Sequence, residues 1–179
     1  YTRVIVMSTE ILVITGPESS GKTTLATQLA NYWKTPLVAE AARDYLKGNG
    51  SYQQHDLLKI AKQQHKQELT VLSHLPERII CDTDLLVIMI WSEVKYGYCD
   101  SWIYSTFENN IKKNNFCRHY YLCDSNIPWQ ADPRRENPHN RDELFDLYLK
   151  KLKEYELDYR IVKGEPRQRL QQVLDSSDS

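Results

Sequence analysis

The residue pattern with the most specific chemistry is Gly16-Pro17-Glu18-Ser19-Ser20-Gly21-Lys22-Thr23, which fits G-x-x-x-x-G-K-[ST]. Glycine at both ends lets the backbone curl until successive N–H groups point at a polyphosphate, and the positive end of a following helix adds to the attraction. We expect Lys22 to reach the β and γ phosphates of a nucleoside triphosphate and the Thr23 hydroxyl to bind Mg²⁺. The alternative is a chance glycine turn. An apolar run of strand length before Gly16 and helical spacing after Gly21 favour the phosphate-binding loop.

Charged residues also follow the second apolar run of the chain, in the stretch VAEAARDYL. Glu40 and Arg43 lie just past this run, where the second substrate of a small kinase would bind if the run is a buried parallel strand. The alternative is an ordinary helix N-terminus, with Glu40 favoured by the helix dipole and Arg43 on the surface.

Two carboxylates follow the third apolar run, in the stretch CDTD. Asp82 comes directly after the run, in a position to bind Mg²⁺ or to accept the proton of a hydroxyl group. Asp84 can equally cap a helix over Leu85–Glu93, and we prefer that interpretation for it.

A loop with an indole, for which the sequence offers no obvious core, and two arginines follows the fourth apolar run, in the stretch CDSNIPWQADPRREN. Arginines on a closing loop stabilise the charge that develops on a transferred phosphoryl group, and closure excludes water. We assign Arg134 to catalysis and Arg135 to the nucleotide, and we expect at least one of them to contact phosphate. The alternative is a solvated charged turn.

The elements that would position these residues are five short apolar runs, each bounded by polar or turn residues. Runs of this length suit strands that are buried on both faces, and helical spacings lie between them. This alternation predicts an α/β fold with a mostly parallel sheet and helices on both sides, and its ligands at the carboxyl ends of the strands. The predicted strands cover Ile11–Thr15, Pro36–Ala39, Arg78–Cys81, His119–Cys123 and Tyr159–Lys163.

Three helices are predicted from apolar spacing. The first follows the glycine loop and carries Leu25, Leu29 and Tyr32, and the third carries Leu144, Leu147, Tyr148, Lys151, Leu152 and Tyr155. The second has a stripe of Leu58, Ala61, His65, Leu69 and Leu72, and we expect the glutamines interleaved with it, among them Gln64, to form its solvated face.

Composition limits the class of protein. The chain has 179 residues, of which 41% are hydrophobic, enough for one domain with a sizeable core. Its 23 basic and 24 acidic residues give no basic field for nucleic acid, so an anionic ligand needs a local site. Four cysteines without metal-site spacing predict free, buried thiols in a reducing cytoplasm, and no run is long and apolar enough for membrane insertion.

We expect residues 1–10 to be an N-terminal extension, native or added by cloning, 11–174 a single kinase domain, and 175–179 a flexible tail.

Taken together, the stretches GPESSGKTTLA, VAEAARDYL, CDTDLLVIMIWSEVKYG, LCDSNIPWQADPRRE and ELFDLYLKKL resemble the ribosylnicotinamide kinase domain of the NadR-type NAD biosynthesis proteins. The resemblance runs from about Ile11 to about Arg169. It implies a P-loop kinase with a three-layer α/β/α fold and a five-stranded parallel sheet. It also implies phosphorylation of the 5'-hydroxyl of nicotinamide riboside with ATP and Mg²⁺, which gives nicotinamide mononucleotide.

The same resemblance implies roles for individual residues. The acceptor would face Glu40, Arg43 and Asp82, and Trp129 in the I-P-W motif would stack on its cationic pyridine ring. Trp91 and Tyr96 lie in a second aromatic segment and are either further substrate contacts or core residues of a helix. The residues that would hold the ATP phosphates are Gly16, Glu18, Ser19, Ser20, Gly21, Lys22, Thr23 and Thr24.

The chain also departs from the family pattern. Ser125 and Asn126 stand where acidic residues are usual before I-P-W, and Ala39 and Ala41 replace bulkier residues around Glu40. Another riboside, a nucleoside or a thiamine-like vitamin therefore remains open as the substrate. A P-loop ATPase that switches a partner without phosphorylating a small molecule also remains open as the function. Assembly into a homo-oligomer remains open as well. A GTPase is disfavoured because no N-K-x-D guanine-binding motif follows a strand.

Overall fold

A five-stranded parallel sheet forms the centre of the computed structural model, which describes residues 8–48, 52–113, 116–125 and 141–177. The strand order is β2-β3-β1-β4-β5, and every neighbouring pair is parallel. The predicted α/β P-loop kinase-like fold is therefore confirmed, and each apolar run that predicts a strand contains one. The strands are β1 Thr9–Thr15, β2 Leu37–Val38, β3 Arg78–Asp82, β4 Phe116–Cys123 and β5 Tyr159–Val162.

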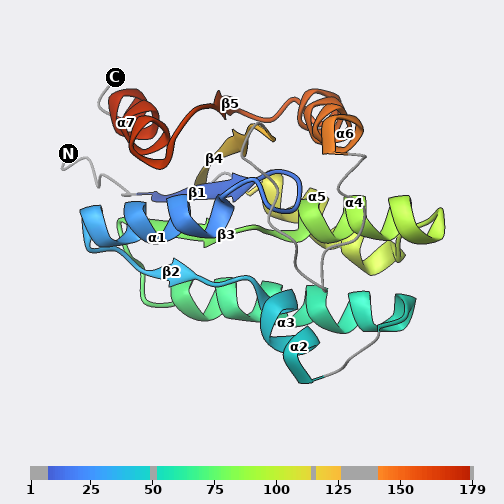
Figure 1. Ribbon diagram of the computed structural model, residues 1–179. Coiled ribbons are helices and arrows are strands. Elements are labelled where there is room, and N and C mark those ends of the chain that lie inside the picture. Colours follow the sequence, from blue (N-terminus) through green and yellow to red (C-terminus); the bar gives the residue numbers. More distant parts are fainter. Residues whose placement is uncertain (1–7, 49–51, 114–115, 126–140, 178–179) are drawn as a thin grey trace.

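Helices connect successive strands and cover both faces of the sheet (Figure 1). One face packs against α1 and α7, and the other against α3, α4, α5 and α6. Side chains of β1 from Ile11 to Ile14 are fully buried because both faces are covered, which explains a continuous apolar run rather than an alternating one. The helices are α1 Lys22–Trp33, α2 Ala41–Gly48, α3 Gln54–Leu72, α4 Leu85–Tyr96, α5 Ser101–Ile111, α6 Arg141–Glu154 and α7 Pro166–Ser177.

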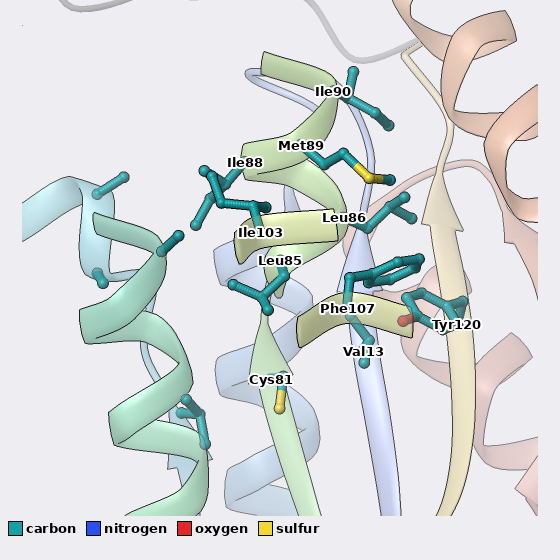
Figure 2. Close-up of a cluster of buried hydrophobic side chains, with 14 of the residues drawn as sticks. Val13, Cys81, Leu85, Leu86, Ile88, Met89, Ile90, Ile103, Phe107 and Tyr120 are labelled. Carbon is teal, nitrogen blue, oxygen red and sulfur yellow. The ribbon is translucent and has the colours of Figure 1, made fainter. Parts of the chain in front are cut away.

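The larger core lies on the face covered by α4 and α5. Figure 2 shows Leu86 and Met89 of α4 near Phe107 of α5 and Tyr120 of β4, and all four side chains are at most 1% exposed. Asp84 caps α4 by accepting a hydrogen bond from Leu86 N at 3.0 Å, as preferred from the sequence. The start of α4, and with it the end of β3, is therefore fixed by packing and by a cap.

The buried face of α3 differs from the predicted stripe by about one residue. Leu69 is 43% exposed, whereas Gln64 and Glu68 are buried, so the expectation that Gln64 is solvated is wrong. Gln64 Oε1 and the Glu68 carboxylate find polar partners inside the molecule, which offsets part of the cost of burying them. The buried side chains of α3 are Leu57, Ile60, Ala61, Gln64, Glu68 and Leu72.

At both ends of the described residues, secondary structure extends into segments that the sequence did not predict to contain any. β1 begins at Thr9, inside the expected N-terminal extension, and α7 continues to Ser177, inside the segment expected to be a flexible tail. Val173 anchors α7 in the core, and the Ser176 and Tyr121 hydroxyls lie 2.9 Å apart. Three of the four cysteines are buried free thiols as predicted, but Cys117 is exposed. Within the described residues no helix combines the length and apolarity needed to span a membrane.

Candidate active site

The glycine loop joins the carboxyl end of β1 to the N-terminus of α1 (Figure 1, blue). Gly16 has a φ of 137°, and a Cβ there would lie 2.9 Å from the Cys123 carbonyl oxygen, so this position requires glycine. Ser19 and Gly21 also have positive φ, of 59° and 81°, and Gly21 is the N-cap of α1. A backbone that alternates between right-handed and left-handed conformations turns successive N–H groups toward a common centre, and this arrangement binds phosphate.

Side chains of the loop fold over it. Lys22 Nζ and Ser20 Oγ both donate hydrogen bonds to the Pro17 carbonyl oxygen, each at 2.7 Å. Glu18 and Thr24 are exposed. The Lys22 ammonium group is thus held against the glycine loop.

A chain of hydrogen bonds joins the predicted residues of three segments. Arg43 Nη2 donates to Thr23 Oγ1 at 2.7 Å, and Thr23 Oγ1 donates to Asp82 Oδ2, also at 2.7 Å. Asp82 is only 2% exposed, and its Oδ1 atom has no hydrogen-bond donor among the described residues. A buried, ionisable oxygen without a donor is a position where a cation or a substrate hydroxyl group can bind.

Glu40 completes this group at the end of β2. Its carboxylate lies 3.4 Å from Arg43 Nη2. Burial raises the pKa of Glu40, and the neighbouring Asp82 raises it further, while Lys22 and Arg43 oppose the shift. A carboxylate with a raised pKa is a better proton acceptor than an ordinary one.

The oxygen atoms of Thr23 and Asp82 fit a magnesium ion. Hard cations prefer oxygen ligands, and Mg²⁺ bound with a nucleotide commonly uses one or two protein oxygens, phosphate oxygens and water. The donorless Asp82 Oδ1 atom supports this fit. A cluster of three or more metal-binding His, Cys, Asp or Glu side chains is absent from the described part of the chain.

Trp91 and Tyr96 belong to a separate aromatic group. Trp91 Nε1 donates to the Tyr52 hydroxyl at 2.7 Å, and Tyr96 OH donates to the Tyr52 carbonyl oxygen at 3.4 Å. The Lys95 ammonium lies 3.8 Å from the centre of the Tyr52 ring. Both rings are half-buried against the core on the α4 face, so they serve at least the structural role that the sequence left open.

The predicted residues of the fourth loop, Trp129, Arg134 and Arg135, lie outside the described residues, as does Asn126. Ser125 is described, and its hydroxyl donates to Asp142 Oδ1 of α6 at 3.0 Å.

Sequence reasoning missed two arginines that contact the glycine loop from behind. Arg141, the first residue of α6, donates from Nη2 to the Ser19 carbonyl oxygen at 3.3 Å. Arg169 of α7 donates from Nη1 to the Ser20 carbonyl oxygen at 2.5 Å. The only signal for Arg169 is its helical spacing of four residues from the buried Val173, which places it on the apolar face of α7.

A buried ionic network, also missed, lies next to the Asp82 segment. Arg118 of β4 pairs with Glu68 of α3 and, at 3.3 Å, with Asp84. The Tyr120 hydroxyl donates to the same Asp84 oxygen at 2.7 Å. Burial raises the pKa of Asp84, and Arg118 opposes that shift. The network holds the residue that follows Asp82 by two positions and so supports the end of β3.

Comparison with known proteins identifies a family and several similar folds. A family model described as an AAA domain matches residues 11–169. No curated protein matches the chain. Among solved structures, a NadR protein in complex with NR is 18% identical, with a TM-score of 0.73. That match covers 98% of this chain and 52% of the NadR chain, so this chain spans about half the length of that protein.

Two further solved structures match over almost their whole lengths. A deoxyadenosine kinase from M. mycoides is 14% identical, with a TM-score of 0.66, and the match covers 94% of this chain and 98% of the kinase. A thymidylate kinase from Ehrlichia chaffeensis is 14% identical, with a TM-score of 0.68, and the match covers 95% and 99%. These likenesses establish a small-molecule kinase-like P-loop fold, and this fold implies nucleotide binding.

Proposed function

We propose that this chain, which belongs to the AAA domain family by a model that matches residues 11–169, is an ATP-dependent kinase. Its acceptor would be the 5'-hydroxyl of nicotinamide riboside. The product would be nicotinamide mononucleotide. The observation that carries the proposal is the hydrogen-bonded group of Arg43, Thr23 and Asp82 beside the glycine loop, with Glu40 next to it. Thr23 and Asp82 would serve Mg²⁺ in any P-loop protein, so Glu40 and Arg43 are the part of this group that a nucleotide-driven switch does not need. The NadR match, a structure in complex with NR, supports nicotinamide riboside as the acceptor.

The two carboxylates have different roles in this proposal. Asp82 is tied to Thr23, and together they would hold Mg²⁺. Magnesium bound there would neutralise charge on the phosphate oxygens. Glu40, with its raised pKa, would accept the proton of the acceptor hydroxyl group. Lys22 would orient the phosphates and Arg43 the acceptor, so positioning and electrostatics would supply most of the acceleration.

A second candidate is a kinase for another nucleoside. Ser125 stands where acidic residues are usual in the resembling family, and its hydroxyl bonds to Asp142 of α6, so this position offers no carboxylate to a pyridinium ring. The likeness to a deoxyadenosine kinase over nearly its whole length also favours this candidate.

The deciding experiment measures ATP consumption and identifies products by mass. The purified protein is offered nicotinamide riboside, thiamine and a panel of nucleosides in parallel with MgATP. Lys22→Ala should abolish turnover, since the lysine that binds the β and γ phosphates is lost. Lys153→Ala, at an exposed position of α6, is the matched control and should keep full activity.

Each outcome is informative. Phosphorylated nicotinamide riboside supports the proposal, and phosphorylation of a different acceptor supports the second candidate. ATP loss without any phosphorylated acceptor contradicts both and favours an ATPase switch. Full activity in Lys22→Ala would remove the glycine loop from the mechanism.

A further inference from the structure

Arg169 is a buried cation that links three loops at the carboxyl edge of the sheet. The residue is 2% exposed. Its Nη1 atom donates to the Ser20 carbonyl oxygen at 2.5 Å, Nη2 to the Asp124 carbonyl oxygen at 3.0 Å, and Nε to the Gly164 carbonyl oxygen at 2.7 Å. It therefore connects the glycine loop with the turns that follow β4 and β5.

The charge of Arg169 is not matched by a carboxylate. Its recorded acceptors are carbonyl oxygens, with the Cys123 thiol nearby, and no ion pair joins it to an acidic side chain in the described ranges. Buried charges in proteins are normally paired, because an unpaired one loses its hydration without an equal return. Carbonyl dipoles offset only part of this cost. An anion bound to the glycine loop, on the side opposite Arg169, would balance the remaining positive charge.

The peptide between Ser20 and Gly21 connects Arg169 to that side. The described residues contain no cis peptide, and in a planar trans peptide the carbonyl and the N–H point in opposite directions. Because the Ser20 carbonyl oxygen points at Arg169, the Gly21 N–H points away from it. A hydrogen bond from a cation to the carbonyl also polarises the peptide and makes this N–H a stronger donor.

We propose that Arg169 is a positioning residue that strengthens the binding of polyphosphate from behind the glycine loop, through its positive charge and the Ser20–Gly21 peptide. The inference rests on nucleotide binding as part of the proposed function, and it holds for any acceptor. It predicts that phosphate groups, and not the nucleoside, respond to the charge at position 169.

Two substitutions separate charge from hydrogen bonding. Arg169→Gln keeps a hydrogen-bond donor and removes the charge, whereas Arg169→Lys keeps the charge with a simpler donor. Arg167→Gln, at an exposed position of the same helix, is the matched control. Binding of inorganic tripolyphosphate, ADP and adenosine to each purified full chain is measured by calorimetry, and folding is checked by urea unfolding.

We expect Arg169→Gln to weaken tripolyphosphate and ADP about tenfold, the scale of one charge-assisted hydrogen bond, and to change adenosine affinity less than about twofold. Arg169→Lys should lose about threefold or less for the phosphate ligands, and Arg167→Gln should match the wild type.

Three results would overturn the proposal. Unchanged tripolyphosphate binding in Arg169→Gln would show that the charge is not used. Equal losses for adenosine and ADP in both variants would make Arg169 a purely structural brace. If the wild type bound neither ADP nor tripolyphosphate, the premise of nucleotide binding would be wrong. That result concerns the wild type alone and is therefore distinct from any effect of the Arg169 variants. If Arg169→Gln does not fold, Arg169→Lys decides: preserved tripolyphosphate affinity supports the proposal, and a loss shared with adenosine contradicts it.

Discussion

At the residue scale, the site contains two carboxylates whose surroundings differ. Asp82 accepts a hydrogen bond from Thr23 and has one oxygen without a donor, whereas Glu40 is half-buried beside Arg43 with a raised pKa. The sequence could place both of them after strands. The sequence could not assign a role to each carboxylate. The roles depend on which of the two side chains faces Thr23, and tertiary packing decides that orientation.

The proton-accepting role of Glu40 predicts a change in pH dependence. Protonation of Glu40 at low pH removes the base, and because burial raises its pKa the loss of kcat/KM should begin above the usual range for a glutamate. Glu40→Gln should lower kcat by about a hundredfold or more and abolish this acid limb. The measurement is kcat/KM between about pH 5 and pH 8, with the affinity for ATP determined separately.

Asp44→Asn is the control for this prediction, since Asp44 is an exposed acid on α2, the helix that begins directly after Glu40. It should keep the acid limb of the wild type. If Glu40→Gln retains that limb, the titrating group lies elsewhere and Glu40 does not accept the proton.

At the scale of elements, the strands and the helices were predictable to different degrees. Each apolar run gave a strand because burial on both faces leaves a clear signal in the sequence. The buried face of α3 differs from the predicted one because Gln64 and Glu68 are polar, and the sequence alone predicts polar residues to be exposed. Gln64 Oε1 accepts a hydrogen bond from Ala41 N at 2.7 Å, and Glu68 pairs with Arg118 of β4. Partners 23 and 50 residues away along the chain leave no local pattern.

The network around Arg118 predicts a large loss of stability on its removal. Arg118→Met leaves the buried Glu68 and Asp84 as two like charges without a cation, and this should lower the free energy of unfolding by about 3–5 kcal/mol. Loss of the cation also raises the pKa of Asp84 further in the folded state, because Arg118 opposes the shift that burial causes. The folded variant therefore takes up protons more readily than its unfolded chain, so stability should recover as the pH falls and decline as it rises.

Urea unfolding at several pH values tests this expectation. Lys112→Met, which removes an exposed cation from the end of α5, is the control and should change the free energy by about 0.5 kcal/mol or less. A loss below about 1 kcal/mol in Arg118→Met, or a loss independent of pH, would show that the network does not depend on Arg118 for its charge balance.

At the scale of the whole molecule, the sheet brings the site together. Thr23 and Asp82 are 59 residues apart in the chain, and they meet because β1 and β3 are neighbours, with Ile14 in register with Asp82. The alternation of strands and helices predicted a parallel sheet with ligands at its carboxyl edge, but it did not predict the strand order. That order depends on which strands are neighbours in space, and the resemblance to a known kinase domain supplied the number of parallel strands but not their order.

This arrangement predicts that nucleotide, metal and folding are linked. ADP at about a hundred times its Kd should raise the free energy of unfolding by about 2.7 kcal/mol, because it binds only the folded chain. Mg²⁺ should lower that Kd, since Thr23 and Asp82 come together only in the folded sheet, and at a fixed ADP concentration it should therefore increase the stabilisation.

Asp82→Asn separates the metal from the nucleotide in this linkage. The variant should keep the stabilisation by ADP without metal, because the glycine loop is intact, and lose most of the Mg²⁺ increment. Thr23→Ser, which keeps the hydroxyl group, should retain that increment. Unfolding in urea with and without Mg²⁺ measures both quantities. If Asp82→Asn preserved the full increment, the metal would be held by groups other than the carboxylate at the end of β3, and the role of the second carboxylate, Glu40, would have to include it.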